Sequence, residues 1–526
     1  MQLIKKTKIF LLLLLFAVSF TLSVIGENAD TGQNGQLYSP VSSFRSYTYN
    51  YWGDPVECPD PYTLKGAYSG IDLGVGNFKN LHDIFIGQDG FIYIAASGDR
   101  EDDNRIVVFD SSLTFIKEYK GITDTDGQFI PFKKPLGVFV TASGEIYAAD
   151  GQAKNIYHFK QDGALIRTIE PPKGEIIDDK FIGRYQPSKL CVDNNGRIHV
   201  IAININEGII EFDKDGQFEG FLAAGKVNPN PLQVIWRRFS TAEQLARMSD
   251  FVPIEYNNIT LDSENFVMAT CAAADEKVVI SEIKRKKGTD QGALVRRLNM
   301  LGKDILRRKG FFPPVGDVDV TDLQIDLTAG YKGISKIMDV YTSDFGVYTV
   351  LDNNRNKLFT YDGEGNLLYC FGGPDVSAGG LKTPISLSGY GDTLYVLDTG
   401  TLTINVYTQT QFSKRILSAI EKSETGKNDS ASEDWQKVLE QNANYDLAYT
   451  GMGKASYMKG EYSEAMRLFK LGDNREWYSR AYKEHRKIIV AKWFAPVSLT
   501  VLVVISSVWL FAVFRKQKKK KYKNLS

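Results

Sequence analysis

The side chains that most often carry enzyme chemistry are few in this sequence. Its four histidines, His82, His158, His199 and His485, form no HExxH or HxH pair. The sequence also contains no GxSxG elbow, no Walker or GxGxxG loop and no Cys/His nucleophile arrangement. A catalytic or metal-binding set would therefore have to be assembled from residues that lie far apart in the chain.

Two stretches are rich in carboxylates, whose oxygens are the ligands that Ca²⁺ prefers. One is the run Asp99, Glu101, Asp102 and Asp103, and the other is the series Asp317, Asp319, Asp322 and Asp326. The run lacks the glycine and the terminal glutamate of an EF-hand loop, and we treat the looser series in the same way. We expect solvated loops in both places, with a Ca²⁺ site as the alternative.

An insertion at about 226–252 carries side chains that are suited to binding. Trp236, Arg237 and Arg238 stand beside Ser240-Thr-Ala-Glu243, a capping box that opens a short helix. Loops on a rigid scaffold often carry binding residues. The insertion could therefore rim a ligand or partner site through Trp236, Arg237 and Arg238.

These residues are set in a pattern that recurs about every 50 residues between about residues 80 and 410. One copy has two apolar runs joined by an Asp-Gly or Asn-Gly turn, then a third run, as in Leu81–Tyr93 followed by Asn104–Asp110. Such a unit cannot bury its own apolar face, so the copies must pack on one another. Six copies of about four short strands each predict a mainly β fold, the six-bladed β-propeller.

The sequence of a strand, Gly, Ile-Tyr, a small pair with Asp, Asn-Arg-Ile and Phe-Asp resembles the NHL-repeat propellers. The fourth copy departs most from the pattern, because of insertions at about 226–252 and 276–292. The sixth copy has no outer strand after Ile404–Tyr407, whereas Tyr62–Ile71 precedes the first blade without a blade of its own. We predict that this N-terminal segment completes the last blade and closes the ring. Upstream, the alternation of Tyr47, Tyr49 and Tyr51 could add a strand or cover one end.

The alignment of the copies bears on the residues singled out above. It is made on Gly90, Gly144, Gly196 and Gly346, and it places His82 opposite Leu136, Ser188 and Met338. Some propeller lyases and lactonases hold a metal on the central axis with ligands from equivalent positions of several blades. A metal ring of three histidines is not expected here, because His82 has no histidine at the equivalent positions. His82 could still line the channel mouth, although we favour an ordinary packed or exposed histidine. Asp150, Asp352 and Asp398 share one position after the second strand, which predicts turn hydrogen bonds rather than catalysis.

From about residue 411 the apolar period becomes helical. The small and aromatic positions of this segment resemble a tetratricopeptide hairpin, and they are Ala448, Gly453, Gly460, Tyr462, Ala465 and Phe469. A generic helical stalk is the alternative. The polar stretch 422–433 predicts a flexible loop, and Asp434–Gln441 predicts the helix that follows it.

Both ends of the chain predict targeting to a membrane. Three lysines precede an apolar run from Ile9 to about Ile25, which is typical of a secretory signal, with cleavage after Gly26 or Ala29. An uncleaved signal anchor is the alternative. The uncharged stretch Phe494–Phe514 is long enough to span a bilayer as a helix. A basic cluster follows it and favours a cytoplasmic C-terminus: Arg515, Lys516, Lys518, Lys519, Lys520, Lys521 and Lys523.

These observations predict six segments. They are a signal peptide (1–26), an aromatic-rich extension (27–61), the propeller (62–410), a tetratricopeptide-like stalk (411–492), a transmembrane helix (493–514) and a basic cytoplasmic tail (515–526). The formal net charge of zero argues against a nucleic-acid partner. Three of the four cysteines, Cys191, Cys271 and Cys370 but not Cys58, occupy apolar strand positions, and we expect buried thiols rather than a disulfide framework.

We therefore predict a membrane-anchored extracellular binding or scaffold protein that recognises a protein or a cell-surface ligand. No cofactor is expected, with a divalent metal such as Ca²⁺ as the alternative. A different prediction is an enzyme similar to the lactonases, with one divalent ion held in the channel by carboxylate and Asn ligands. A third is an accessory component of a sugar-uptake membrane complex, which rests on the resemblance alone.

Overall fold

The computed structural model of the protein describes residues 46–50, 55–174, 177–223, 255–273, 278–279, 292–308, 316–319, 333–374 and 380–523. The predicted signal peptide, Tyr51 and the candidate residues Trp236, Arg237 and Arg238 lie outside these ranges.

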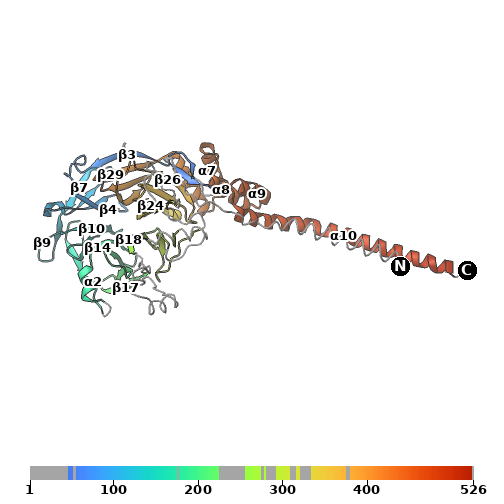
Figure 1. The fold of residues 1–526 in the computed structure, drawn as a ribbon, viewed down its shortest axis with the longest axis horizontal. Coiled ribbons are helices and arrows are strands. Elements are labelled where there is room, and N and C mark those ends of the chain that lie inside the picture. The colour runs from blue at the N-terminus through green and yellow to red at the C-terminus, as the bar shows by residue number, and fades with distance from the viewer. Residues whose placement is uncertain are drawn as a thin grey trace, which may run out of the picture. The chain divides into compact units, whose positions relative to one another are not determined.

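Six antiparallel sheets follow one another along the chain as the blades of a propeller (Figure 1). The inner strands of the blades are β4 (Asn80–Ile86), β10 (Pro135–Val140), β14 (Pro187–Val192), β18 (Glu255–Leu261), β23 (Ile337–Thr342) and β27 (Pro384–Tyr390). The second strands are β5 (Ile92–Ser97), β11 (Ile146–Asp150), β15 (Ile198–Ala202), β19 (Val267–Ala273), β24 (Tyr348–Asp352) and β28 (Thr393–Asp398). Each inner strand contacts the inner strand of the next blade, and β27 contacts β4, so the ring is closed. The predicted six-bladed propeller is confirmed.

The outer strands complete the blades. The third strands are β6 (Arg105–Phe109), β12 (Asn155–Phe159), β16 (Ile209–Phe212), β20 (Val295–Leu298), β25 (Lys357–Tyr361) and β29 (Thr403–Gln409). The fourth strands of blades one, two, three and five are β7 (Phe115–Tyr119), β13 (Leu165–Ile169), β17 (Phe218–Leu222) and β26 (Leu367–Gly372). Two short hairpin sheets, β8 (Gly121–Thr123) with β9 (Phe129–Pro131) and β21 (Val318–Asp319) with β22 (Gly333–Ile334), lie outside the blades.

The ring closes through the segment that precedes the first blade. Strand β3 (Tyr62–Ser69) pairs antiparallel with β29 along its whole length, from Tyr62 opposite Gln409 to Ser69 opposite Thr403. Blade six is therefore built from both ends of the propeller sequence, as predicted. The pairing covers the edge that β29 would otherwise expose to solvent.

A second N-terminal piece extends blade five. Strand β1 (Tyr47–Tyr49) pairs with β26 on one side and with β2 (Pro55–Glu57) on the other, so the blade has six strands. The Tyr47 hydroxyl donates to a carboxylate oxygen of Asp317 at 2.5 Å, and Tyr49 also hydrogen-bonds to Asp317. Asp317 is 4% exposed, so the prediction of a solvated loop is wrong for this residue. Its carboxylate instead ties the N-terminal hairpin to blade five.

The repeated aspartates at the ends of second strands accept backbone hydrogen bonds, as predicted. The Asp150 carboxylate accepts from the N–H groups of Lys133 at 2.6 Å and Lys134 at 2.9 Å, in the loop that leads into its own inner strand. Asp352 accepts from the N–H of Lys336 at 3.0 Å in the same way. These side chains are fully buried and order the loop between neighbouring blades.

Five helices follow the propeller: α6 (Gln411–Glu424), α7 (Asn428–Gln441), α8 (Asp446–Met458), α9 (Tyr462–Leu471) and α10 (Arg475–Lys523). The predicted loop at 422–433 is wrong, because only residues 425–427 separate α6 from α7. The polar residues that suggested a loop form the end of α6 and the first turns of α7, where Ala431 is buried. Phe412, Trp435 and Tyr445 share one core with blades five and six, and the Tyr445 hydroxyl donates to the Leu368 carbonyl at 2.8 Å. In Figure 1, α7 and α8 are seen beside β26.

The C-terminal helix α10 runs for 49 residues. It packs on α9 through Phe469, Trp477 and Ala481, and it continues through the apolar stretch without a break. A window of this helix has a mean hydropathy of 2.5 and no buried residues, so by length and composition it could span a membrane. At about 1.5 Å per residue the whole helix is about 74 Å long, well over the thickness of the hydrocarbon core.

All four cysteines are free and buried, which agrees with the prediction of buried thiols. Burial raises the pKa of Cys58 and of Cys271 to about 12, so both thiols are protonated near neutral pH.

Candidate functional site

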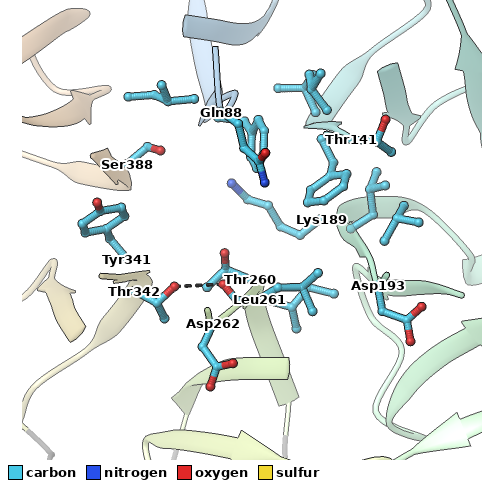
Figure 2. Close-up of a pocket in the computed structure, with 18 of the residues that line it drawn as sticks. Gln88, Thr141, Lys189, Asp193, Thr260, Leu261, Asp262, Tyr341, Thr342 and Ser388 are labelled. Atoms are coloured by element: carbon cyan, nitrogen blue, oxygen red, sulfur yellow. Dashed lines mark hydrogen bonds between the residues drawn. The ribbon is translucent and has the colours of Figure 1, made fainter. Parts of the chain in front are cut away.

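A hollow of about 810 Å³ opens at the channel of the propeller, on the face where the inner strands end. All six blades line it with the last residues of the inner strand or the turn that follows, from Asp83 in blade one to Gly389 in blade six. Figure 2 shows Lys189 reaching toward the middle of this hollow, with Tyr341 and Ser388 on one side and Thr141 on the other. We refer to this space as the channel hollow.

The floor of the hollow is shaped by a β-bulge that recurs in every blade. In each inner strand one residue is skipped in the pairing with the second strand. The skipped residues are His82, Leu136, Ser188, Asn257, Met338 and Ile385. The residues that follow the skip occupy one equivalent position, the channel ring, and they are Asp83, Gly137, Lys189, Asn258, Asp339 and Ser386. A bulge re-aims the residue that follows it, and here it does so in all six blades around one axis.

Two of the ring side chains, Lys189 and Asp83, pair across the channel. The Lys189 ammonium forms an ion pair with Asp83, and it also donates to the His82 carbonyl at 3.2 Å. Lys189 belongs to blade three and Asp83 to blade one, and the ring residue between them is Gly137. A Cβ at residue 137 would lie 2.3 Å from the Ser188 carbonyl oxygen, so the backbones of β10 and β14 approach too closely for a side chain there.

The Ser386 hydroxyl joins two buried carboxylates. Its Oγ lies 3.1 Å from Asp83 Oδ1 and 2.8 Å from Asp339 Oδ2. One hydroxyl carries one proton, so it donates to only one of the two carboxylates at a time. When Asp339 is protonated, its own O–H supplies the second hydrogen bond. The floor therefore has a place for an extra proton.

Backbone groups hold these ring side chains from the next blade. Asp83 accepts the N–H of Val138 at 3.0 Å, and Asp339 accepts the N–H of Leu387 at 2.7 Å. Ser386 in turn accepts the N–H of Ile84 at 3.3 Å, which links blade six to blade one. In each case the ring side chain bonds the residue after the ring position of the following blade. The ring therefore joins the blades as well as forming the floor.

Asp339 is the ring residue whose titration is most altered. The pKa of Asp339 is raised from 3.8 to about 6. Burial is the largest cause and the nearby Asp83 carboxylate adds to it, whereas Lys189 and the hydrogen bonds from Leu387 and Ser386 oppose the rise. Because the two buried carboxylates share a single ammonium, protonation of Asp339 relieves the repulsion between them.

This shift predicts a pH dependence of stability. The folded protein binds a proton at Asp339 more tightly than the unfolded chain does, so the free energy of unfolding falls as the pH rises from about 4 to about 6. A pKa of about 6 against 3.8 corresponds to about 3 kcal/mol in full, of which about 2.4 kcal/mol is lost between pH 4 and pH 7.5. Urea unfolding of Asp339→Asn should lack this loss, whereas Asp126→Asn on the exposed surface should retain it. The assignment would be contradicted if the free energies of unfolding of the wild-type protein and Asp339→Asn differed by the same amount at pH 4 as at pH 7.5.

The walls above the floor are aromatic and aliphatic, and the rim is polar. The rings of Phe85 and Phe139 lie 4.8 Å apart, and Tyr341 lines the wall on the side of blade five. The Thr342 hydroxyl donates to the Leu261 carbonyl at 2.8 Å and ties blade five to blade four at the rim (Figure 2). An apolar wall with a few placed polar groups is the usual form of a ligand pocket.

The hollow also borders the helical segment. A smaller cavity of about 320 Å³ shares Tyr341, Ser343 and Asp344 with the hollow, and its other wall includes Leu417 and Ser418 of α6. A ligand that extends from the hollow over blade five would therefore contact helix α6.

His82 lies at the start of an inner strand, as expected, but it does not line the channel hollow. Its Nε2 lies 2.6 Å from the Ser97 hydroxyl. Burial lowers the pKa of His82 to about 4, with Lys134 and Lys189 adding to the effect, so the imidazole is neutral near pH 7. A binding role for His82 stays a prediction, as it does for Trp236, Arg237 and Arg238.

The floor residues were not singled out by sequence reasoning. The only signal in the sequence is their common position, one residue after the histidine or its equivalent in each copy. Five residue types occur at that position in the six copies, so it shows no conserved residue type among the copies.

The described part of the chain contains no group of three or more His, Cys, Asp or Glu side chains arranged to hold a metal ion. At the channel floor the carboxylates of Asp83 and Asp339 are engaged by Lys189, Ser386 and backbone N–H groups. Asp102 of the acidic run pairs with Lys120 at 3.1 Å on the exposed surface.

No protein-family model matches the sequence, and no curated protein matches it. Among solved structures, virginiamycin B lyase from Staphylococcus aureus is 12% identical with a TM-score of 0.36, over 66% of this chain and 100% of the lyase chain. A candidate gluconolactonase is 9% identical with a TM-score of 0.37, over 67% of this chain and 94% of its own. A protein of unknown function from Bacteroides thetaiotaomicron is 11% identical with a TM-score of 0.36, over 69% of this chain and 75% of its own.

These similarities are too low to carry an argument about function. The class of protein is defined by the strand pairing itself, which makes this chain a six-bladed β-propeller with an appended helical segment and a helix that could span a membrane. Its resemblance to the NHL repeats stays a prediction, as does the tetratricopeptide-like character of α6 to α9.

Proposed function

We propose that this protein is a membrane-anchored binding protein that takes its ligand into the channel hollow on the outside of the cell. The observation that supports this most is the combination of a large hollow, lined by all six blades, with a floor on which Asp83 and Lys189 are engaged with each other. A catalytic acid or base must be free to exchange a proton with a substrate. Lys189, Asp83 and Ser386 instead hold one another and the neighbouring blades.

The position outside the cell rests on the sequence of the two ends. A secretory signal would export the chain, and the apolar part of α10 with the basic cluster behind it would keep the C-terminus in the cytoplasm. The propeller would then stand outside, held to the membrane by one helix. The shared core of α6 to α8 with blades five and six makes the helical segment part of the presented surface.

The experiment that tests this proposal places a photo-crosslinking amino acid at the hollow in the full-length protein in intact cells. Gln88 and Ser143 are exposed and line the hollow from blades one and two. Glu219, which is exposed on the outer strand β17, serves as the matched control. We expect adducts at residues 88 and 143 and none at residue 219, with the partner identified by mass spectrometry.

Two results would overturn the proposal. The first is that residues 88, 143 and 219 all give the same adducts, or that none of them gives an adduct. The other is a stoichiometric, tightly bound divalent ion in the purified protein together with loss of that ion in Asp83→Asn, which would favour the lactonase-like alternative. If the crosslinked partner is a component of a sugar-transport complex, the result supports the alternative that this protein is an accessory component of such a complex.

A further inference from the structure

We infer that the ligand of the channel hollow presents a positively charged amino or guanidinium group to the floor. The inference rests on the proposed function, because it names the chemistry of the group that enters the same hollow. It is carried by two buried carboxylates that share one ammonium, and by the walls that lead down to them.

The floor lacks one positive charge. Asp83 and Asp339 are both buried, and they face each other across Ser386. Among the described residues Lys189 is the one cation that pairs with either of them, and it pairs with Asp83. The other groups around Asp339 are neutral, since they are the hydroxyl of Ser386 and backbone N–H groups. Buried charges are ordinarily paired. A cation from a ligand would supply the missing partner.

Apart from Lys189, every charged side chain that lines the hollow is a carboxylate. Its lining contains six carboxylates and one ammonium, namely Asp83, Glu145, Asp193, Asp262, Asp339 and Asp344 with Lys189. Arg197 pairs with Asp193 at 2.6 Å and Arg297 pairs with Asp262 at 2.6 Å from behind the wall. Of the described residues, this leaves Glu145, Asp344 and one floor carboxylate without a cationic partner.

The histidine next to Glu145 does not change this balance. His158 Nε2 lies 2.9 Å from the Glu145 carboxylate, but burial lowers the pKa of His158 and the ring is neutral near pH 7. Asp344 stands exposed at the rim, on the side where α6 borders the hollow. The field within the hollow therefore attracts cations from the rim down to the floor.

The walls suit the same ligand. The face of an aromatic ring attracts a cation, and the hydrocarbon stem of a basic side chain packs on apolar surface. Phe85, Phe139 and Tyr341 line the path between the acidic rim and the acidic floor. A lysine or arginine side chain of a partner and a free organic amine share this chemistry.

Titration of the purified full-length protein in a non-ionic detergent tests the inference. The probes are blocked Gly-Lys-Gly, Gly-Gln-Gly and Gly-Glu-Gly peptides and free putrescine, followed by calorimetry at pH 7.5. We expect the lysine peptide to bind about tenfold more tightly than the glutamine peptide, and the glutamate peptide not to bind. Stronger binding of the peptide than of putrescine would indicate a protein partner, and the reverse would indicate a small amine.

Variants connect the probe to the named carboxylates. Asp339→Asn, Glu145→Gln and Asp344→Asn should each weaken binding of the lysine peptide about three- to tenfold, whereas Asp126→Asn should leave it unchanged. Glu145→Gln and Asp344→Asn lie at the rim and keep the test valid if Asp339→Asn fails to fold. Equal binding of the lysine and glutamine peptides, or unchanged binding in both rim variants, would overturn the inference. If crosslinking at residue 88 still captures a partner in that case, the proposed function stands and only the charge of the ligand is wrong.

Discussion

Replacement of Lys189 by methionine should lower the free energy of unfolding by about 3–5 kcal/mol. Methionine keeps most of the length of the side chain but removes the ammonium that pairs with Asp83. Two buried carboxylates would then face each other without a counter-charge, and removal of one partner of a buried ion pair usually costs this much. Urea unfolding of the full-length protein in detergent at pH 7.5, followed by circular dichroism, measures the loss.

The matched control for this prediction is Lys214→Met. Lys214 also pairs with an aspartate, Asp215, but its side chain is 70% exposed, and exposed pairs contribute at most about 1 kcal/mol. The double variant Lys189→Met/Asp83→Asn should recover part of the lost stability, because one of the two uncompensated charges is removed with the ammonium. If Lys189→Met costs no more than Lys214→Met, the ion pair does not hold the channel floor together.

Truncation of Asp398 to alanine should cost about 4 kcal/mol and loosen the blade that closes the ring. The carboxylate of Asp398 is fully buried and accepts four backbone N–H groups, from Lys382 at 2.5 Å, Thr383 at 3.0 Å, Gly400 at 2.8 Å and Thr401 at 3.2 Å. Alanine leaves these donors without an acceptor, and each buried donor left unpaired costs about 1–3 kcal/mol. The total is held near 4 kcal/mol because the loops can relax toward water.

Thermal unfolding together with limited trypsin digestion checks this second prediction. Lys382 lies in the loop that Asp398 orders, so Asp398→Ala should be cleaved there faster than the wild-type protein. Asp392→Ala, in the same blade but 47% exposed and paired with Lys414, should change neither measurement by much. Asp398→Asn should fall between the two, because one oxygen remains as an acceptor. Equal digestion of Asp398→Ala and Asp392→Ala would show that the aspartate does not hold the closing blade.

Local periodicity was enough to predict the blades and the residues that order their loops. The apolar runs recur because each central strand is buried on both faces between neighbouring blades, as in β5 and β11. Asp150, Asp352 and Asp398 recur because blades two, five and six use the same carboxylate to satisfy the N–H groups of the loop before the inner strand. When several repeats meet one structural requirement with the same residue type, that residue recurs at a fixed position. Such a recurrence can be recognised in the sequence.

The polar stretch at 422–433 shows where local reading fails. Its serines, glycine and acidic residues suggest a loop by composition, yet most of it is helix in α6 and α7. The helical ends are stabilised by packing that composition does not show. Asp434 of α7 forms ion pairs with Arg415 at 3.1 Å and Lys422 at 2.5 Å, both of which belong to α6. Trp435 packs in the core that the helices share with the propeller.

The amino-acid sequence by itself determined that this protein is a closed six-bladed propeller with a helical segment after it, because turn chemistry and the burial of the apolar runs act within each repeat. It also placed His82 correctly at the start of an inner strand. Only the tertiary structure decided which residues meet at the channel. A bulge skips His82 and its equivalents and turns the next residue toward the axis. The blades contribute different residues at the axis, with aspartate in only two of them and glycine in one. The ring of Asp83, Lys189, Asp339 and Ser386 is held by pairs between different blades, which no single repeat encodes.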